Sequence, residues 1–201
     1  MSYSSVDRLV EFLIKRKYAI EADRRILSYG LYTGLETLLI ISISLLFGLF
    51  FGHLGELCVF LVAFTPLRKF AGGYHSKHAG RCFIFSIGAV LVFLTCIRYV
   101  SESKLLWISL IVWFVSSIFL SLYMPVESQS KPLDSKEKVY FRRKSLLILA
   151  IECIAVFLFL KLGFKKIASA ISMSITFTAF LVLLEVCTRK IPTKQDMLTK
   201  Q

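Results

Sequence analysis

The amino-acid sequence predicts an all-α, polytopic integral membrane protein with about six transmembrane or re-entrant helices and an N-terminal amphipathic helix at the membrane interface. Hydrophobic residues make up 56% of the 201 residues, above the roughly 45–50% of soluble globular domains. The 25 Lys and Arg outnumber the 13 Asp and Glu, for a formal net charge of +12. These cations cluster between long apolar runs, as in membrane proteins. A basic nucleic-acid-binding protein would intersperse them among polar residues, so we expect no nucleic-acid partner.

The first thirty residues predict an amphipathic, basic helix on the cytoplasmic face of the membrane. Apolar residues recur at the spacing of one helix face: Val6, Leu9, Val10, Leu13 and Ile14. Six Lys and Arg in the same stretch would attract anionic headgroups, although a solvated helix packed on the rest of the protein explains the pattern equally well. No apolar core or cleavage site of a secretory signal peptide is visible there. We assign residues 1–30 to this helix, 31–190 to a helical transmembrane domain and 191–201 to a cytoplasmic tail.

Six apolar segments follow the N-terminal helix. They cover approximately residues 35–52, 54–67, 82–98, 105–124, 145–163 and 167–187. Because a helix needs about 20 residues to cross a bilayer, the fourth and sixth segments cross easily. The second reaches only about 21 Å, so it tilts into thinned lipid, extends into flanking residues or re-enters. Glycines at 48, 52 and 55 predict a break between the first and second segments.

The distribution of cations predicts the orientation of the chain. With six crossings and the N-terminus inside, 20 of the 25 Lys and Arg face the cytoplasm, as the positive-inside rule requires. Merging the first two segments would place the cluster at 68–81 outside, against that rule. We therefore expect both termini in the cytoplasm.

The stretch from Arg68 to Cys82 carries the chemistry that the sequence predicts. Of five cysteines, Cys82 is the one that begins an apolar segment among cations, next to Arg81 and near Lys77. A helix N-terminus and neighbouring cations both favour the thiolate over the thiol. A thiolate near a potential imidazole base is the equipment of a cysteine nucleophile.

Two histidines compete for the role of base. On an unbroken helix His75 would lie two turns from Cys82, about 10.5 Å away, which is too far for a hydrogen bond. Glycines at 72, 73 and 80 would allow the chain to bend and bring His75 closer. His78, four residues before Cys82, could reach it on a continuous helix, so spacing alone favours His78.

Two other interpretations of this stretch stay open. His75, His78 and Cys82 share one face of a helix and would supply three ligands to a catalytic zinc ion, but the sequence has no HExxH motif. Alternatively, the protein is a small membrane transporter or scaffold without catalysis, and the stretch is a cytoplasmic hairpin. Loss of function on Cys82→Ser would argue against the transporter, and insensitivity to chelators would argue against zinc.

The order of a basic residue, Gly73-x-His75 and then Cys82 seven positions later resembles the accessory gene regulator B (AgrB) family of quorum-sensing membrane endopeptidases. The basic N-terminus, the number of apolar segments and the long basic connection from Pro125 to Lys144 also resemble that family. The resemblance therefore covers nearly the whole chain.

This resemblance implies a multi-pass cysteine endopeptidase of the bacterial plasma membrane with its active site at the cytoplasmic face. Such proteins cleave a short AgrD-like precursor peptide near its C-terminus. His75 matches the family's catalytic histidine and Cys82 its nucleophile, which holds the peptide as an acyl thioester. A Cys or Ser of the peptide then closes a thiolactone or lactone ring, which gives a quorum-sensing autoinducer. The resemblance also implies a homodimer, and no cofactor is expected.

Several further residues are candidates for supporting roles. Arg68, Lys69 and Gly73 are expected to bind the acidic tail that the family's precursors carry, because the basic cytoplasmic face would steer that tail. Glu36 enters the first apolar segment, where an ionisable group is a functional candidate by default. It would orient the His75 imidazole, or else lie at the headgroup boundary or pair with an arginine.

Overall fold

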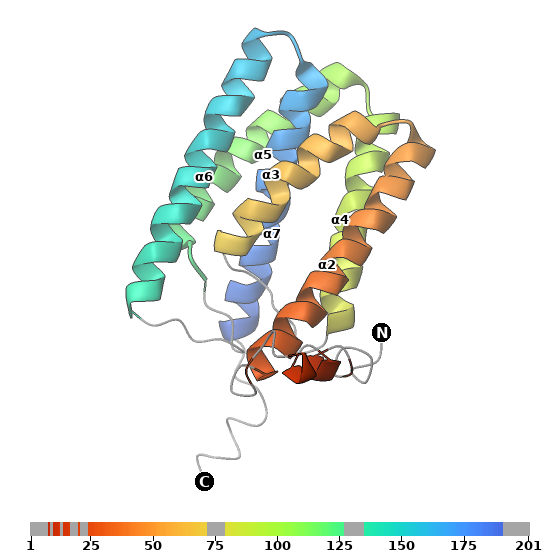
Figure 1. The fold of residues 1–201 in the computed structure, drawn as a ribbon. Coiled ribbons are helices and arrows are strands. Elements are labelled where there is room, and N and C mark those ends of the chain that lie inside the picture. Colours follow the sequence, from red (N-terminus) through yellow and green to blue (C-terminus); the bar gives the residue numbers. More distant parts are fainter. Residues whose placement is uncertain are drawn as a thin grey trace. The chain divides into compact units, whose positions relative to one another are not determined.

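The protein is described by a computed structural model that covers residues 8, 10–12, 14–16, 20, 24–71, 79–126 and 135–190. Within these ranges the chain forms six long helices (Figure 1). They are α2 Arg24–Phe51, α3 Leu54–Ala71, α4 Ala79–Tyr99, α5 Glu102–Tyr123, α6 Ser135–Lys161 and α7 Lys165–Lys190. The six helices correspond in order to the six apolar segments, which confirms the predicted fold class.

The chain divides into two compact units, residues 1–44 and 45–201. The first unit holds most of α2 and a short N-terminal stretch in which the described residues are largely helical. In that stretch Lys15 and Glu11 form an ion pair of 3.3 Å one turn apart, as expected for a helix. The boundaries at residues 30 and 190 that the sequence suggests stay a prediction.

Left-handed glycines end α2 and form the turn between α6 and α7. Gly52 has a φ of 73°, and its N–H donates to the carbonyl of Leu49 while that of His53 donates to Gly48. Gly163 has a φ of 81° in the α6–α7 turn. Glycine adopts this conformation without a Cβ clash and so ends a helix sharply. The predicted break between the first two apolar segments is therefore confirmed.

Three of the described helices contain stretches long and apolar enough to cross a membrane: Gly30–Phe51, Glu102–Tyr123 and Lys165–Cys187. Phe83–Tyr99 is a shorter apolar helix. Helix α3 continues through Pro66 to Ala71, so its 18 residues span about 27 Å, which is longer than the segment 54–67. Helix α6 starts at Ser135, ten residues before its apolar segment. The number of crossings stays a prediction.

Helix α7 is the central helix of the second unit and packs against α3, α5 and α6. One buried apolar cluster joins α3, α5, α6 and α7 around Leu67, Leu120 and Val182. A second joins α3, α4 and α7 around Phe60 and Phe93. Small residues on α7 allow this close approach, and three buried hydroxyls bond to carbonyls of its own preceding turn: Ser172, Ser174 and Thr178.

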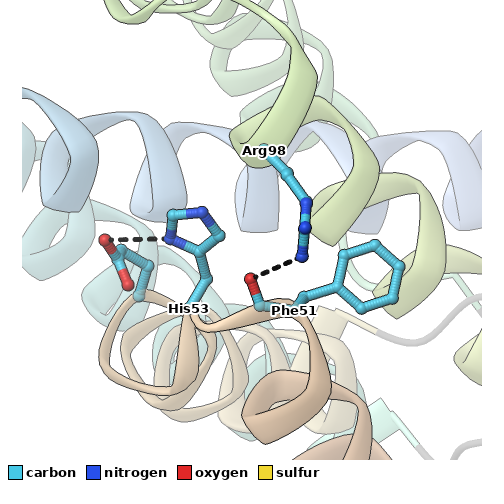
Figure 2. A network of polar contacts seen from close by, with 4 residues as sticks. Phe51, His53 and Arg98 are labelled. Atoms are coloured by element: carbon cyan, nitrogen blue, oxygen red, sulfur yellow. Dashed lines mark hydrogen bonds and ion pairs between the residues drawn. The ribbon is translucent and has the colours of Figure 1, made fainter.

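A polar network ties the α2–α3 turn to the last turn of α4 (Figure 2). The Arg98 guanidinium donates to the carbonyl of Phe51 at 3.2 Å and lies over the Phe51 ring. His53 Nδ1 lies 3.4 Å from a carboxylate oxygen of Glu56. Because α4 begins at Ala79, this network fixes the end of α4 opposite to Cys82.

The close approach of α2 and α3 generates a first prediction. A Cβ at Gly48 would lie 2.6 Å from Cδ2 of Leu57, a fully buried side chain that would have to shift, and 3.4 Å from the Cα of Leu54. We expect Gly48→Ala to destabilise the protein by about 1–3 kcal/mol, measured as a lower thermal unfolding midpoint in detergent micelles. Gly88→Ala on α4 is the control, because its Cβ would meet no atom of the described chain within 4 Å. An unchanged midpoint for Gly48→Ala would contradict this packing.

Candidate active site

The structure places some of the predicted site residues and leaves others outside its described part. Cys82 is the fourth residue of α4, and its backbone but not its side chain is described. His75, His78 and Gly73 lie outside the described residues. The pairing of Cys82 with either histidine, and the alternative zinc site built from the same residues, therefore stay predictions.

The position of Cys82 in the first turn of α4 agrees with its expected place at the start of the third apolar helix. Helix α4 begins at Ala79. The first four N–H groups of a helix have no partner within it, and they form the positive end of the helix dipole. Helix N-termini favour the thiolate form of cysteines in general, and the thiolate expected at Cys82 stays a prediction.

Arg68 connects the last turn of α3 to the second turn of α4. Its Nη1 donates a 2.7 Å hydrogen bond to the Ser86 hydroxyl, and its guanidinium lies 5.7 Å from the centroid of the Phe64 ring. Ser86 is buried and follows Cys82 by four residues in the sequence of α4. The hydrogen bond therefore joins Arg68 to α4 one turn further along the helix than the residue Cys82.

Lys69 and Glu36 occupy different settings. Lys69 follows Arg68 in the last turn of α3 and is exposed, with its Nζ 6.0 Å from the centroid of the Phe70 ring. It is thus available to a partner at this end of α3. Glu36 is half-buried on the part of α2 that belongs to the unit 1–44.

The end of α3 is held by the segment that follows α5. The Val126 N–H donates to the carbonyl of Ala71 at 3.0 Å. Residues 72–78, which contain His75, connect this fixed end to Ala79 at the start of α4. The expected catalytic histidine, His75, thus lies in the connection between α3 and α4, outside the described residues.

Ser86 is a site residue that the sequence interpretation missed. A polar residue four positions after the candidate nucleophile, inside an otherwise apolar helix, was the available signal. Its partner on α3 follows only from the way the two helices pack.

Comparison with known proteins identifies relatives over most of the chain. The model of the family described as Accessory gene regulator B matches residues 6–182. An AgrB-like protein of Clostridium perfringens (strain SM101 / Type A) is 24% identical over 180 residues, which cover 82% of each chain. A second AgrB-like protein, from Clostridium perfringens (strain 13 / Type A), is 25% identical over 188 residues and 86% of each chain. No solved structure matches.

The Arg68–Ser86 hydrogen bond generates a second prediction. Ser86→Ala removes the acceptor of a charged donor. We expect it to lower the free energy of unfolding by about 1–3 kcal/mol, measured by thermal unfolding of the purified protein. Ser109→Ala on α5 is the matched control, because the buried Ser109 hydroxyl bonds to a carbonyl of its own helix, that of Leu106. If Ser86→Ala and Ser109→Ala lower the free energy of unfolding by the same small amount, the interhelical hydrogen bond adds no stability beyond that of a bond within one helix.

Proposed function

The chain belongs to the accessory gene regulator B family, and from this premise we propose that it is a membrane-embedded cysteine endopeptidase. Family membership supports a role in the processing of an autoinducer. The proposed substrate is a small AgrD-like precursor peptide, which is cleaved near its C-terminus and cyclised to a thiolactone or lactone. The observation that carries the proposal is Cys82 in the first turn of α4, with Arg68 hydrogen-bonded to Ser86 four residues further along that helix.

The proposed reaction proceeds through an acyl thioester. His75 accepts the proton of the Cys82 thiol, and the thiolate attacks the carbonyl carbon of the scissile peptide bond. As the C–N bond breaks, His75 returns the proton to the leaving amine. The C-terminal fragment departs with a new amino terminus, and the rest of the precursor stays bound through its acyl group to Cys82.

Ring closure is the second half of the proposed reaction. A Cys thiol or Ser hydroxyl of the bound peptide attacks the thioester carbonyl, and the Cys82 thiol is regenerated. Transfer from one thioester to another is nearly balanced in free energy, whereas an enzyme serine would form a more stable oxoester and make thiolactone formation unfavourable. A site at the membrane boundary would also restrict water, which otherwise hydrolyses the intermediate.

The cations at the end of α3 have separate proposed roles. Arg68, anchored by Ser86, favours the negative charge at Cys82 and meets the substrate backbone there. The exposed Lys69 attracts the acidic tail of the precursor, and Gly73 leaves room for the peptide. Glu36 orients the His75 imidazole in this proposal.

The proposed setting is the bacterial plasma membrane. Both termini and the active site face the cytoplasm, as the positive-inside rule favours, and two copies form a homodimer by analogy with the family. The reaction as written uses no cofactor.

The thiolate at Cys82 generates a third prediction. In protein reconstituted in lipid nanodiscs, we expect the alkylation rate of Cys82 to rise with pH around a midpoint at least about one unit below the free-thiol pKa of about 8.5. His75→Ala should move this midpoint back up, and His78→Ala should not. The measurement is mass spectrometry of each cysteine after timed alkylation.

Cys58, exposed on the flank of α3, is the internal control in the same samples. Its rate should be unaffected by either histidine substitution. If Cys82 reacts like an ordinary thiol in every variant, the protein without substrate holds no preformed nucleophile. That result would contradict the proposed site.

The acyl intermediate generates a fourth prediction. Cells that express the protein with an AgrD-like precursor should accumulate the cleaved C-terminal fragment, and Cys82→Ala and Cys82→Ser should each lower cleavage at least about 1,000-fold. Denatured wild-type protein should carry a peptide mass on Cys82 that hydroxylamine removes. Cys58→Ser should cleave normally. Undiminished activity of Cys82→Ser would instead favour a transporter or scaffold.

A further inference from the structure

Glu152 is the one charged residue in the apolar part of α6, residues 145–160. The nearest cations on the same helix are Lys144, eight residues before it, and Lys161, nine residues after it. Their Cα atoms are therefore about 12 Å and about 13.5 Å from that of Glu152 along the helix axis. The Lys144 ammonium lies 5.8 Å from the centroid of the Tyr140 ring, one turn farther from Glu152, and Lys161 is exposed. Neither lysine is placed to pair with the carboxyl group.

The Glu152 side chain lies on the buried side of α6. Leu149, three residues before it, and Val156, four residues after it, both belong to the buried apolar cluster that joins α6 to α3, α5 and α7. Glu152 itself is only 6% exposed. Both of its carboxyl oxygens are buried, and neither has a hydrogen-bond partner among the described residues. The carboxyl group is thus buried beside an apolar cluster without a polar partner from the described chain.

Helices α5 and α7 supply no charge to the middle of α6. Residues 105–122 of α5 and 167–184 of α7 contain no Asp, Glu, Lys, Arg or His. The thiol of Cys153, the residue after Glu152, lies 3.8 Å from the Ser117 hydroxyl, so α5 meets α6 here within its uncharged stretch. Helix α7 contributes apolar residues of the same uncharged stretch to the cluster that contains Leu149.

Helix α3 has its charged residues at its two ends. Arg68 and Lys69 are in its last turn, and Glu56 is in its first turn, where it lies 3.4 Å from His53. Between these ends the helix has one titratable side chain, the exposed thiol of Cys58. The other thiol near Glu152 is that of Cys153 on α6 itself. A thiol carries no positive charge in either of its protonation states, so neither can neutralise a carboxylate.

The isolation of Glu152 determines which form of its carboxyl group the packed helices tolerate. A carboxylate without a partner is far less stable in apolar surroundings than in water, whereas a neutral acid loses much less on burial. Ionisable groups buried without a partner therefore become neutral instead of paying that cost. The burial of Glu152 among uncharged helix stretches thus favours the carboxylic acid over the carboxylate.

We propose that Glu152 is a proton-binding site, which holds a proton while α6 packs against α3, α5 and α7 and releases it when these helices separate. On release the O–H bond breaks, its electron pair stays on the carboxylate oxygen, and a water molecule that reaches the site accepts the proton. A higher pH therefore favours separation of the helices. The proposal concerns none of the residues of the proposed active site and does not rest on the function proposed for Cys82.

The pH dependence of the thermal stability of Glu152→Gln tests this inference. Glutamine resembles the neutral acid in size and does not ionise. In the unfolded wild type a water-exposed glutamate is ionised above about pH 4.3, so the unfolded state binds fewer protons than the folded state and stability falls as pH rises. Between about pH 5.5 and about pH 7 we expect the unfolding midpoint of the wild type in detergent micelles to fall relative to that of Glu152→Gln. The expected slope is about 3–5 °C per pH unit.

Glu102→Gln is the matched control. Glu102 is exposed in the first turn of α5, so it is ionised in the folded and the unfolded state alike. The midpoint of its variant should keep a constant offset from the wild type over the same pH range. If Glu152→Gln fails to fold, Glu152→Leu supplies the comparison, because leucine does not ionise and suits the apolar surroundings.

Infrared absorption detects the proton in the folded protein. The carbonyl of a protonated carboxylic acid absorbs apart from the bands of carboxylates, and exposed glutamates are ionised near neutral pH. The spectrum of the wild type in nanodiscs at about pH 7 should therefore contain a protonated-acid band that Glu152→Gln lacks and Glu102→Gln keeps. Other buried carboxyl groups contribute equally to all three spectra.

Two outcomes would overturn the inference. One is an offset between the midpoints of wild type and Glu152→Gln that stays constant with pH, because Glu152 would then have the same protonation state folded and unfolded. The other is a protonated-acid band of equal size in both proteins. Neither measurement uses a precursor peptide, so failure of the cysteine endopeptidase proposal would leave both results interpretable.

Discussion

A chain in lipid must satisfy its backbone hydrogen bonds internally, and this constraint determines where chemistry can be placed in the protein. Away from helix ends every N–H and C=O of a crossing segment is used by the helix itself. Free backbone donors occur only in the first turns of helices, and the candidate nucleophile is in such a turn. The candidate site is therefore expected at a helix start, close to where the Arg68 side chain reaches α4 from α3.

Side chains inside the bundle obey the same constraint. The hydroxyls of Ser172, Ser174 and Thr178 return their hydrogen bonds to α7, so α7 presents a nearly apolar surface despite its serines. This allows one helix to contact three others closely. The Arg68 guanidinium is held by Ser86 on another helix, whereas the carboxyl group of Glu152, buried on α6, has no hydrogen-bond partner among the described residues. Interhelical polar contacts are found at both ends of α4, with Arg68 and Ser86 near its start and Arg98 and Phe51 near its end.

The sequence predicted the fold class, the six helices and the turn at Gly52, because hydropathy and glycine act locally. The predicted apolar segments were shorter than α3 and α6 at the basic ends of these helices. Arg and Lys on exposed helix sides continue a helix although they are not apolar. The start of α4 near Cys82 was also predictable from the change in hydropathy. The partner of Ser86 was not, because it depends on how α3 packs against α4, which the periodicity of a single helix does not reveal.

The short connection between α3 and α4 limits how far these two helices can move apart. Seven residues, 72–78, separate Ala71 at the end of α3 from Ala79 at the start of α4. Because an extended chain spans at most about 3.6 Å per residue, these two helix ends can lie no more than about 29 Å apart. The length of the connection therefore sets an upper limit on any rearrangement of α3 against α4 at this end.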